Sequence, residues 1–183
     1  PVVAAALERG IEVTGELELA WRLLDGHPFV AVTGTNGKTT TVELLGAIWR
    51  AAGLPVEVAG NVGRPLADLV GTAQEGATVI CEASSFQLED ASAFAPECAV
   101  LLNVEPDHLD RHGTLEQYTA AKMRIFAHDP PHVVMPQDLD ADPFDLGEVA
   151  LRGEHNRQNA RAAALAADAM GVPRTAVVQA LEA

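Results

Sequence analysis

The residues best suited to chemistry form a glycine-rich loop at positions 34–40, with the sequence GTNGKTT. The loop lies between an apolar run and a stretch of helical periodicity, the setting of a phosphate-binding loop. Its glycines let backbone N–H groups and a helix N-terminus face an anion. Lys38 would then reach the outer phosphates of a nucleotide, and the Thr39 hydroxyl would ligate Mg²⁺. The loop is a shorter form of the strict phosphate-loop pattern GxxxxGK[ST], which would require a glycine at position 32, where this chain has Val32. The alternative to a phosphate-binding loop is an ordinary glycine turn with an exposed lysine.

Two further groups of polar residues follow apolar, strand-like runs. Glu82 comes directly after TVIC, and a carboxylate at a strand end beside a phosphate loop is where a Mg²⁺ ligand belongs. His108, within NVEPDHLD, could bind a metal through one nitrogen while a carboxylate orients the other. The alternatives are a solvated charge at Glu82 and a structural histidine at His108. The histidines without such a setting are expected on surfaces or loops, and they are His27, His112, His128 and His132.

Two helical segments carry polar residues whose roles the pattern leaves open. Lys122 lies inside a helix that the capping box TLEQ opens, and periodicity alone predicts a surface lysine that extends its amine into solvent. The segment GEHNRQN puts His155, Asn156 and Asn159 at a helix start. Helix capping would account for Asn156, and Asn159 would present a second amide to the same side.

Strand-like runs alternate with helical patterns along the chain. Strands are predicted at 11–13, 29–33, 56–59, 78–81 and 98–104, with a possible one at 132–135. Helices are predicted at 2–9, 16–24, 38–52, 66–70, 114–126, 155–170 and from 173 onward. Near-continuous apolar strands between helices indicate an α/β fold, a mostly parallel sheet with helices on both faces and the ligand outside the carboxyl ends of its strands. Residues 127–153, rich in proline and aspartate, are predicted as loop or linker.

The chain of 183 residues carries 26 acidic against 12 basic side chains, a formal net charge of −14. This balance argues against a nucleic-acid or anionic-membrane partner, because lysine and arginine hold phosphate backbones. No apolar stretch approaches the roughly 20 residues of a membrane-spanning helix, and residues 1–10 lack a signal-peptide pattern. With only Cys81 and Cys98, no disulfide framework is expected, and the cytoplasm is the predicted compartment.

Six segments together resemble the Mur ligases, the ATP-dependent amide-forming enzymes of bacterial cell-wall precursor synthesis. They are VTGTNGKTT (32–40), GNVGRPL (60–66), EASSFQLE (82–89), NVEPDHLDRHG (103–113), AAKMRIF (120–126) and GEHNRQNARAAALAADA (153–169). The resemblance implies three domains, of which this chain is similar to the central, ATP-binding one. Residues 1–28 would be the tail of the N-terminal UDP-substrate domain and a linker. Residues 29–183 would be the central domain, shortened around 127–153, with the C-terminal domain absent.

The resemblance also implies roles for individual residues. The triphosphate would lie on Gly34, Thr35, Asn36, Gly37, Lys38, Thr39 and Thr40. Thr39 and Glu82 would ligate one Mg²⁺, and His108 would ligate a second one near an acyl phosphate. Lys122 matches the family lysine that carries a carbamate, an anionic ligand assisting that second ion. Asn61 and Ser84 would meet substrate and phosphates, whereas His155, Asn156 and Asn159 would lie near the nucleotide base. The catalytic candidates are therefore Lys38, His108 and Lys122.

The segment SSFQLE is the most discriminating part of the resemblance. It favours D-glutamate as the incoming amino acid and UDP-N-acetylmuramoyl-L-alanine as the acceptor, joined through an acyl phosphate with ATP and two Mg²⁺ ions. A sibling ligase that takes another amino acid, or adds glutamate to folate, shares the loop and the metal residues. A phosphate-loop GTPase or kinase is disfavoured, because no DxxG after an apolar run and no NKxD follow the loop. A non-catalytic ATP-binding module is the third alternative.

Overall fold

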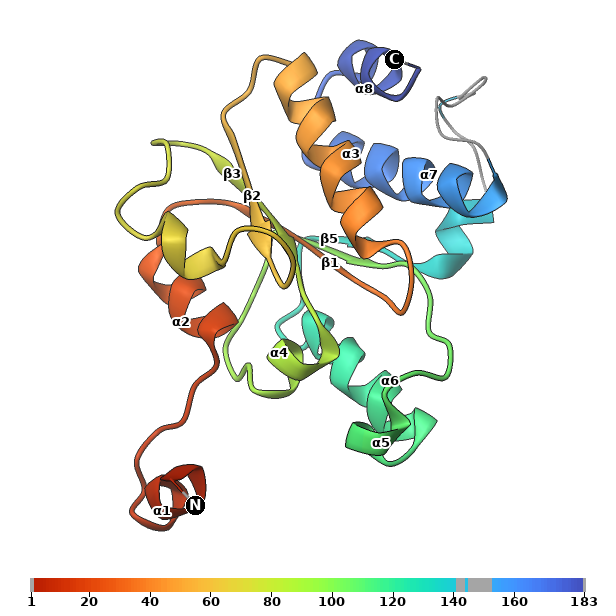
Figure 1. Cartoon of the computed structure of the whole chain (residues 1–183). Coiled ribbons are helices and arrows are strands. Elements are labelled where there is room, and N and C mark those ends of the chain that lie inside the picture. Colours follow the sequence, from red (N-terminus) through yellow and green to blue (C-terminus); the bar gives the residue numbers. More distant parts are fainter. Residues whose placement is uncertain (1, 141–143, 145–152, 183) are drawn as a thin grey trace.

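The computed structural model describes residues 2–140, 144 and 153–182. Its centre is a five-stranded parallel sheet in the order β2-β3-β1-β4-β5 (Figure 1). The strands are β1 (Phe29–Thr33), β2 (Val56–Gly60), β3 (Thr78–Glu82), β4 (Cys98–Leu101) and β5 (His132–Val134). In the middle of the sheet, Val30 pairs with Ile80 of β3 and with Cys98 of β4. The predicted α/β fold with a parallel sheet is confirmed.

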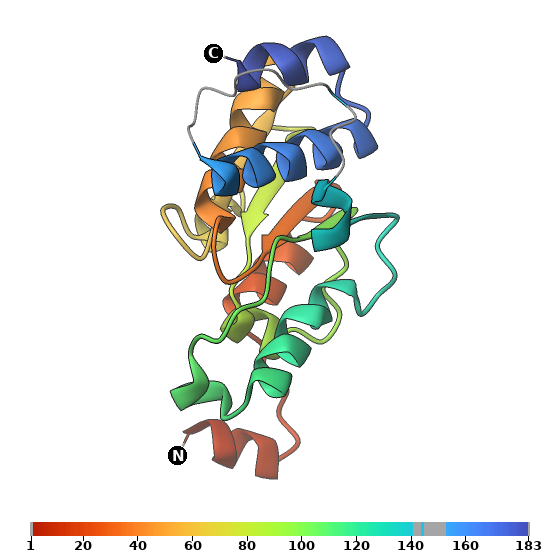
Figure 2. The same ribbon diagram turned by 90° about the vertical axis from the view of Figure 1, so that its right-hand side faces the viewer.

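Three helices cover one face of the sheet. They are α3 (Lys38–Ala51), α7 (Glu154–Ala169) and α8 (Arg174–Leu181) (Figures 1 and 2). Helix α3 contacts both of the others and also β1, β2 and β3. Leu45 and Ile48 of α3 are fully buried in this layer. The alanine-rich α7 can approach closely because Ala160, Ala163 and Ala167, also fully buried, carry little bulk.

A second apolar core lies on the opposite face of the sheet. Its helical elements are α2 (Glu16–Leu23), η1 (Leu66–Leu69), α4 (Ser85–Glu89) and η2 (Arg124–Phe126). Leu17, Phe29 and Phe94 are buried there, and the Trp21 ring meets Phe94 edge-on with 5.9 Å between centroids. Helices therefore cover both faces, as predicted, and the segment from Glu16 to Leu24 packs into the same core as the sheet.

A buried carboxylate fixes α2 to the segment that follows α4. Glu18 is fully buried and accepts hydrogen bonds from the backbone N–H groups of Ser92 and Ala93, from the Ser92 hydroxyl and from Arg22. Burial alone would raise the pKa of Glu18, but these donors, the backbone ones foremost, lower it to about 2. The charged carboxylate is thus part of the folded structure.

Two helices beyond the carboxyl edge of the sheet, α5 (Leu109–His112) and α6 (Leu115–Met123), extend the molecule at that end. The 3₁₀ turn η3 (Pro136–Asp140) contacts α7. Helix α1 (Val2–Glu8) lies apart from the sheet, at the end opposite α8 in both views, and none of its seven residues is buried (Figures 1 and 2). Within the described part of the chain, no helix is long and apolar enough to cross a membrane.

Some local predictions differ from the structure. No strand forms at 11–13, and the strand predicted at 98–104 ends at Leu101. The region predicted as loop at 127–153 contains β5 and η3, which confirms the possible strand, and residues 141–143 and 145–152 lie outside the described residues. Helix capping, the alternative explanation for Asn156, does not apply, because α7 begins at Glu154 with Gly153 as its N-cap. Asn156 lies within the first turn instead.

Candidate active site

The phosphate loop joins β1 to α3 through a glycine in the left-handed conformation. Gly37 is the N-cap of α3 and has a φ of +84°. A Cβ at this position would lie 2.2 Å from Asn159 Oδ1, so both the backbone and α7 require glycine here. The first N–H groups of a helix have no carbonyl partner within the helix, and the positive end of its dipole lies beside them. The start of α3 is therefore suited to bind an anion.

Lys38 and Thr39, the next two residues, direct polar atoms to the same edge of the sheet. Lys38 Nζ folds back over the loop and donates to the carbonyl oxygens of Gly34 (3.0 Å) and Thr35 (2.9 Å). Thr39 Oγ1 donates to Glu82 Oε2 over 2.7 Å. Glu82, at the end of β3, is only 3 % exposed. A hydroxyl and a carboxylate oxygen in contact are a donor pair that suits Mg²⁺.

Asn61, predicted to meet substrate, contacts the same carboxylate. Its Nδ2 lies 3.3 Å from Glu82 Oε1, and its backbone N–H donates to the Glu82 carbonyl over 2.9 Å. Gly60 permits this approach, because a Cβ there would lie 2.3 Å from the Glu82 carbonyl oxygen. The structure thus brings Thr39, Asn61 and Glu82 together from the ends of three different segments.

Lys122 lies at the centre of the site and not on the helix surface. Its side chain is 1 % exposed, its Nζ donates to the Gly34 carbonyl over 2.7 Å, and it lies 4.5 Å from the centroid of the Tyr118 ring. Burial lowers the pKa of the Lys122 ammonium to about 8, Lys38 acts in the same direction, and Asp107 opposes both. The surface lysine predicted from periodicity is wrong, because the covering residues come from other elements.

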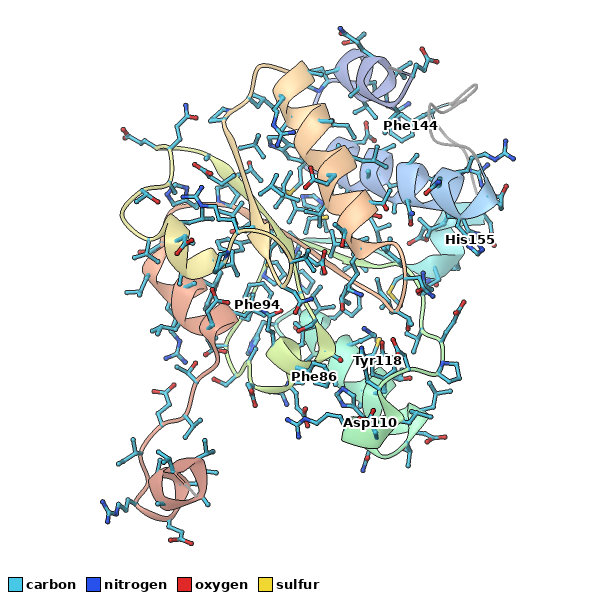
Figure 3. All side chains as sticks on the ribbon, viewed as in Figure 1. Phe86, Phe94, Asp110, Tyr118, Phe144 and His155 are labelled. Carbon is cyan, nitrogen blue, oxygen red and sulfur yellow. The ribbon has the colours of Figure 1, made fainter. Side chains whose placement is uncertain are left out.

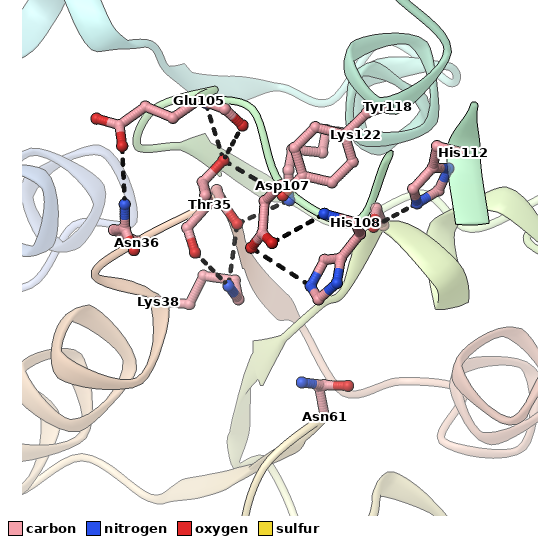
Figure 4. A network of polar contacts seen from close by, with 12 residues as sticks. Thr35, Asn36, Lys38, Asn61, Glu105, Asp107, His108, His112, Tyr118 and Lys122 are labelled. Atoms are coloured by element: carbon pink, nitrogen blue, oxygen red, sulfur yellow. Dashed lines mark hydrogen bonds and ion pairs between the residues drawn. The ribbon is translucent and has the colours of Figure 1, made fainter. Parts of the chain in front are cut away.

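His108 stands on the other side of the site, at the start of α5 (Figure 4). It adopts a left-handed conformation with φ of +51°, which is uncommon for a residue with a side chain. Its backbone N–H donates to Asp107 Oδ1 over 2.8 Å, and its Nε2 lies 3.5 Å from Asp107 Oδ2. Its side chain is half exposed, and the centroid of its ring lies 5.2 Å from the centroid of the Phe86 ring. An exposed ring nitrogen beside a carboxylate is a possible metal ligand.

His112, predicted as a surface or loop residue, is instead buried in α5. It is 6 % exposed, its Nε2 lies 3.0 Å from the Ser85 hydroxyl, and its ring stacks on Phe86 with 5.1 Å between centroids. Figure 3 places Phe86 and Tyr118 on the neighbouring helices α4 and α6, next to this contact. Ser84, predicted to meet substrate, forms a capping box with Gln87 at the start of α4. Ser85 and Phe86 of α4, His112 of α5 and Tyr118 of α6 thus form one packed cluster that joins the three helices.

Three residues that the sequence pattern did not single out contact the phosphate loop. Asn103, Glu105 and Tyr118 form hydrogen bonds with Thr35 or Asn36. The available signal was an amide, Asn103, near the end of the apolar run 98–104, at the edge of the sheet that also carries Glu82. The sequence could not show which loop atoms it contacts.

The residues predicted to lie near the nucleotide base come from the first two turns of α7. Asn159 is 7 % exposed and lies against Gly37, Asn156 is half-buried, and His155 is exposed (Figure 3). A small pocket lies between α7 and the loop. It is lined by Asn36, Gly37, Leu102, Asn103, Leu139, His155, Gln158 and Asn159. The pocket adjoins the anion-binding start of α3, so a nucleotide could extend from one to the other.

Comparison with known proteins identifies the class. The family described as the Mur ligase middle domain matches residues 32–145, and the chain belongs to the Mur ligase family. The fold agrees. The UDP-N-acetylmuramate:L-alanyl-gamma-D-glutamyl-meso-diaminopimelate ligase from Neisseria meningitides superimposes with a TM-score of 0.69 at 24 % identity, over 100 % of this chain and 74 % of that one. MurF from Acinetobacter baumannii superimposes with a TM-score of 0.66 at 22 % identity, over 91 % of this chain and 48 % of that one.

Relatives named UDP-N-acetylmuramoylalanine–D-glutamate ligase are similar in sequence. The one from Pelotomaculum thermopropionicum is 40 % identical over 93 % of this chain and 47 % of its own length. The one from Anaeromyxobacter dehalogenans is 38 % identical over 100 % of this chain and 50 % of its own length, and that from Desulfotalea psychrophila is 52 % identical over 68 % and 27 %. The chain therefore spans about half the length of the first of these relatives. The Anaeromyxobacter alignment runs over 233 positions, so that relative contains residues with no counterpart in this chain.

Proposed function

We propose that this chain is the ATP-binding centre of a ligase that joins D-glutamate to UDP-N-acetylmuramoyl-L-alanine and releases ADP and phosphate. The observation that carries this proposal is the convergence of Lys38, Thr39, Glu82 and Lys122 around one loop, in a chain similar to relatives of that name. The SSFQLE segment supports D-glutamate over the amino acids of sibling ligases.

The proposed nucleotide site uses the loop and the start of α3. The triphosphate would lie on residues 34–40, with Lys38 released from its loop carbonyls to bind the outer phosphates. The base would lie toward Asn156 and Asn159 of α7. The free N–H groups at the helix start and the lysine supply the local positive charge that a chain of net charge −14 otherwise lacks.

The donor atoms present fit Mg²⁺. Thr39 and Glu82 would hold one ion, and His108, with a carboxylate on Lys122, would hold a second. When bound, Mg²⁺ neutralises phosphate charge during transfer. The described residues contain no group of three histidine, cysteine or acidic side chains able to hold a metal unaided, so phosphate oxygens would complete the coordination.

The reaction proceeds by activation of a carboxylate, which is a poor acyl donor. A carboxylate oxygen of the UDP-linked acceptor attacks the γ-phosphorus of ATP, the bond to the bridging oxygen breaks, and ADP leaves. The neutral amine of D-glutamate then attacks the carbonyl carbon of the acyl phosphate. Phosphate leaves with the bonding electrons, and the amine loses a proton to give the amide. Lys38 holds and orients the phosphates in the first step.

Lys122 is proposed to carry a carbamate. Its buried amine, with a pKa of about 8, is neutral in a useful fraction near neutral pH. The neutral nitrogen forms a bond to the carbon of CO₂ and loses a proton, which leaves a carboxylate in place of a cation. The Lys122 amine lies between Lys38 and His108 in Figure 4, where a carboxylate on it would offer oxygen ligands.

The proposed function is tested in two stages. Calorimetry with this chain first establishes whether ATP and Mg²⁺ bind. ADP release is then measured from the full-length protein with UDP-N-acetylmuramoyl-L-alanine and one candidate amino acid at a time. Release that depends on D-glutamate supports the proposal, whereas release with another amino acid supports a sibling ligase. Binding without turnover for any amino acid would identify a non-catalytic ATP-binding module.

A further inference from the structure

The amide side chain of Asn103 satisfies three backbone groups of the phosphate loop at once. Its Oδ1 accepts the N–H groups of Thr35 (3.1 Å) and Asn36 (2.9 Å), and its Nδ2 donates to the Asn36 carbonyl over 3.1 Å. Only an amide offers an acceptor and a donor on one short side chain, so aspartate or leucine could not make the full set.

A second set of contacts lies around the same two loop residues (Figure 4). Thr35 Oγ1 accepts the Glu105 N–H over 3.0 Å and lies 3.2 Å from both the Glu105 carbonyl and the Tyr118 hydroxyl. Asn36 Nδ2 donates to Glu105 Oε2 over 3.1 Å. We refer to Asn103, Glu105 and Tyr118 as the loop clamp.

The loop clamp is not needed to complete the sheet. The pairing of β1 with β4 already ends in a regular way, with the Leu102 N–H donating to the Thr33 carbonyl over 3.0 Å. Beyond that bond, the backbone carbonyl of Asn103 also accepts the Thr35 N–H over 3.1 Å, and the half-buried Asn103 side chain adds its own bonds to Thr35 and Asn36. Its contacts therefore act on the loop, which has to pass through the left-handed Gly37 before α3 begins.

The loop clamp also connects the two halves of the site. Glu105 lies three residues before His108 on the same connection, and Tyr118 lies one helical turn before Lys122, whose ammonium group contacts the Tyr118 ring. A loop that shifts away from the clamp would change its distance from both His108 and Lys122.

We propose that Asn103 is a positioning residue, which holds the phosphate loop in its nucleotide-binding conformation before the nucleotide arrives and sets its distance from the His108 and Lys122 half. This inference rests on the proposed ATP site. A loop ordered in advance binds its ligand without the loss of conformational freedom that a mobile loop would undergo. Asn103 itself need not touch the nucleotide.

The first test uses the nucleotide-free chain, so it does not depend on the proposed function. Amide exchange of Thr35 and Asn36 is measured by NMR in the wild type and in Asn103→Ala. We expect exchange of Asn36, whose N–H donates to the Asn103 side chain, to be about tenfold faster in the variant, the effect of about 1.4 kcal/mol of lost local stability. Thr35 should change less, because its N–H keeps a bond to the backbone carbonyl of residue 103. Exchange of Val79, a buried residue in β3, should not change. Unchanged exchange at Asn36 would overturn the proposal.

The second test measures the rate and affinity of Mg²⁺–ATP binding. We expect Asn103→Ala to bind about tenfold more weakly, mainly through slower association, with little change in melting temperature. The matched control is Asp168→Ala, which removes two side-chain hydrogen bonds to Arg174 at the far end of α7 and should bind ATP as the wild type does. Equal affinity and association rate in wild type and Asn103→Ala would contradict the inference.

Asn103→Leu repeats both tests with the side-chain volume retained and every hydrogen-bonding atom removed. If neither variant folds, Asn103 is a structural residue of the sheet and the positioning role is wrong. If the wild type binds no ATP, the proposed function fails, and the exchange measurement alone then decides whether the loop clamp orders the loop.

Discussion

Lys38 and Lys122, the only two lysines of the chain, donate to the same carbonyl oxygen, that of Gly34, over 3.0 and 2.7 Å. Two ammonium groups on one acceptor repel each other, and the burial of Lys122 increases the cost of its charge. The site therefore favours any change that adds negative charge or removes a proton. Binding of an anionic phosphate at Lys38 would add negative charge, and deprotonation of Lys122 would remove a proton, so the two changes can be tested at separate residues.

Lys38→Ala is expected to weaken ATP binding by about 10- to 100-fold, because a charged donor to phosphate is among the strongest hydrogen-bonding groups. Isothermal titration calorimetry with Mg²⁺–ATP measures the change. The control is Arg50→Ala, which removes an exposed positive charge from the last turn of the same helix. If both variants lose the same small amount of ATP affinity, Lys38 contributes only to the overall positive charge near the site and makes no direct contact with the phosphates.

Lys122→Ala is expected to abolish turnover in the full-length enzyme, since the carbamate cannot form. Formate or acetate in the buffer should restore part of the activity, because a small carboxylate fits the space that the side chain leaves. Chloride at the same ionic strength serves as the control. Full activity of this variant without any carboxylate would rule out the carbamate.

The lowered pKa of Lys122 predicts a stability that depends on pH. Between about 8 and the ordinary value of 10.5, the unfolded chain binds more protons than the folded one. The free energy of unfolding of the wild type should therefore rise with pH across this window, whereas that of Lys122→Met should not show this rise. Below about pH 8 the wild type carries the full destabilisation that comes from burying the charged ammonium group. Urea unfolding in CO₂-free buffer at pH 7 to 10 measures the difference.

Selective ¹⁵N-lysine labelling checks the same value directly, because the chain gives only two side-chain signals. One Nζ is expected to titrate near pH 8, and the signal that disappears in Lys122→Met assigns it. Two titrations at or above pH 10 would contradict the burial of this amine.

Glu18→Gln is expected to lower the free energy of unfolding by about 2 kcal/mol at pH 7, because a buried, fully bonded carboxylate is replaced. Since the folded pKa is lowered from 4.5 to about 2, this contribution is present above pH 4.5 and is lost as the pH falls toward 2. The variant and the wild type should converge in acid. Glu12→Gln, whose exposed carboxylate also binds Arg22, should lose less than about 1 kcal/mol.

Gly37→Ala and Gly53→Ala form a matched pair. Both glycines are left-handed, with φ of +84° and +68°, but a Cβ at Gly53 meets open space while one at Gly37 meets Asn159. Gly53→Ala should cost about 1–2 kcal/mol of stability from the backbone alone. Gly37→Ala should cost more and also remove ATP binding. Equal losses of stability, with ATP affinity retained, would show that α7 does not constrain the loop.

Much of the fold followed from local patterns. The apolar runs of β1 to β4, the periodicity of α3 and the glycine-rich loop between β1 and α3 predicted the sheet and its functional edge. Thr39 lies at the start of α3, just after the loop that follows β1, and Glu82 ends the adjacent strand β3, so bringing the two together required only the parallel pairing of β1 and β3.

The rest depended on contacts between distant segments. Helix α6 has no continuous apolar stripe, so nothing in its periodicity indicated that Lys122 is buried. His112 is enclosed by Ser85 and Phe86, which lie more than twenty residues earlier in the chain. Asn103 became informative only when its amide was seen against the backbone of Thr35 and Asn36.

The strand order has a consequence for how the protein is made. β1 lies in the middle of the sheet, where Phe29 pairs with Val79 and Val30 pairs with Cys98. At a synthesis rate of about 5–20 residues per second, β1 waits several seconds for its second neighbour. Pairings between segments so far apart also form slowly. The phosphate loop, which is bonded to Asn103 beyond β4, therefore takes shape only after β4 has been synthesised, and we expect ATP to give no protection to a nascent chain that ends before β4.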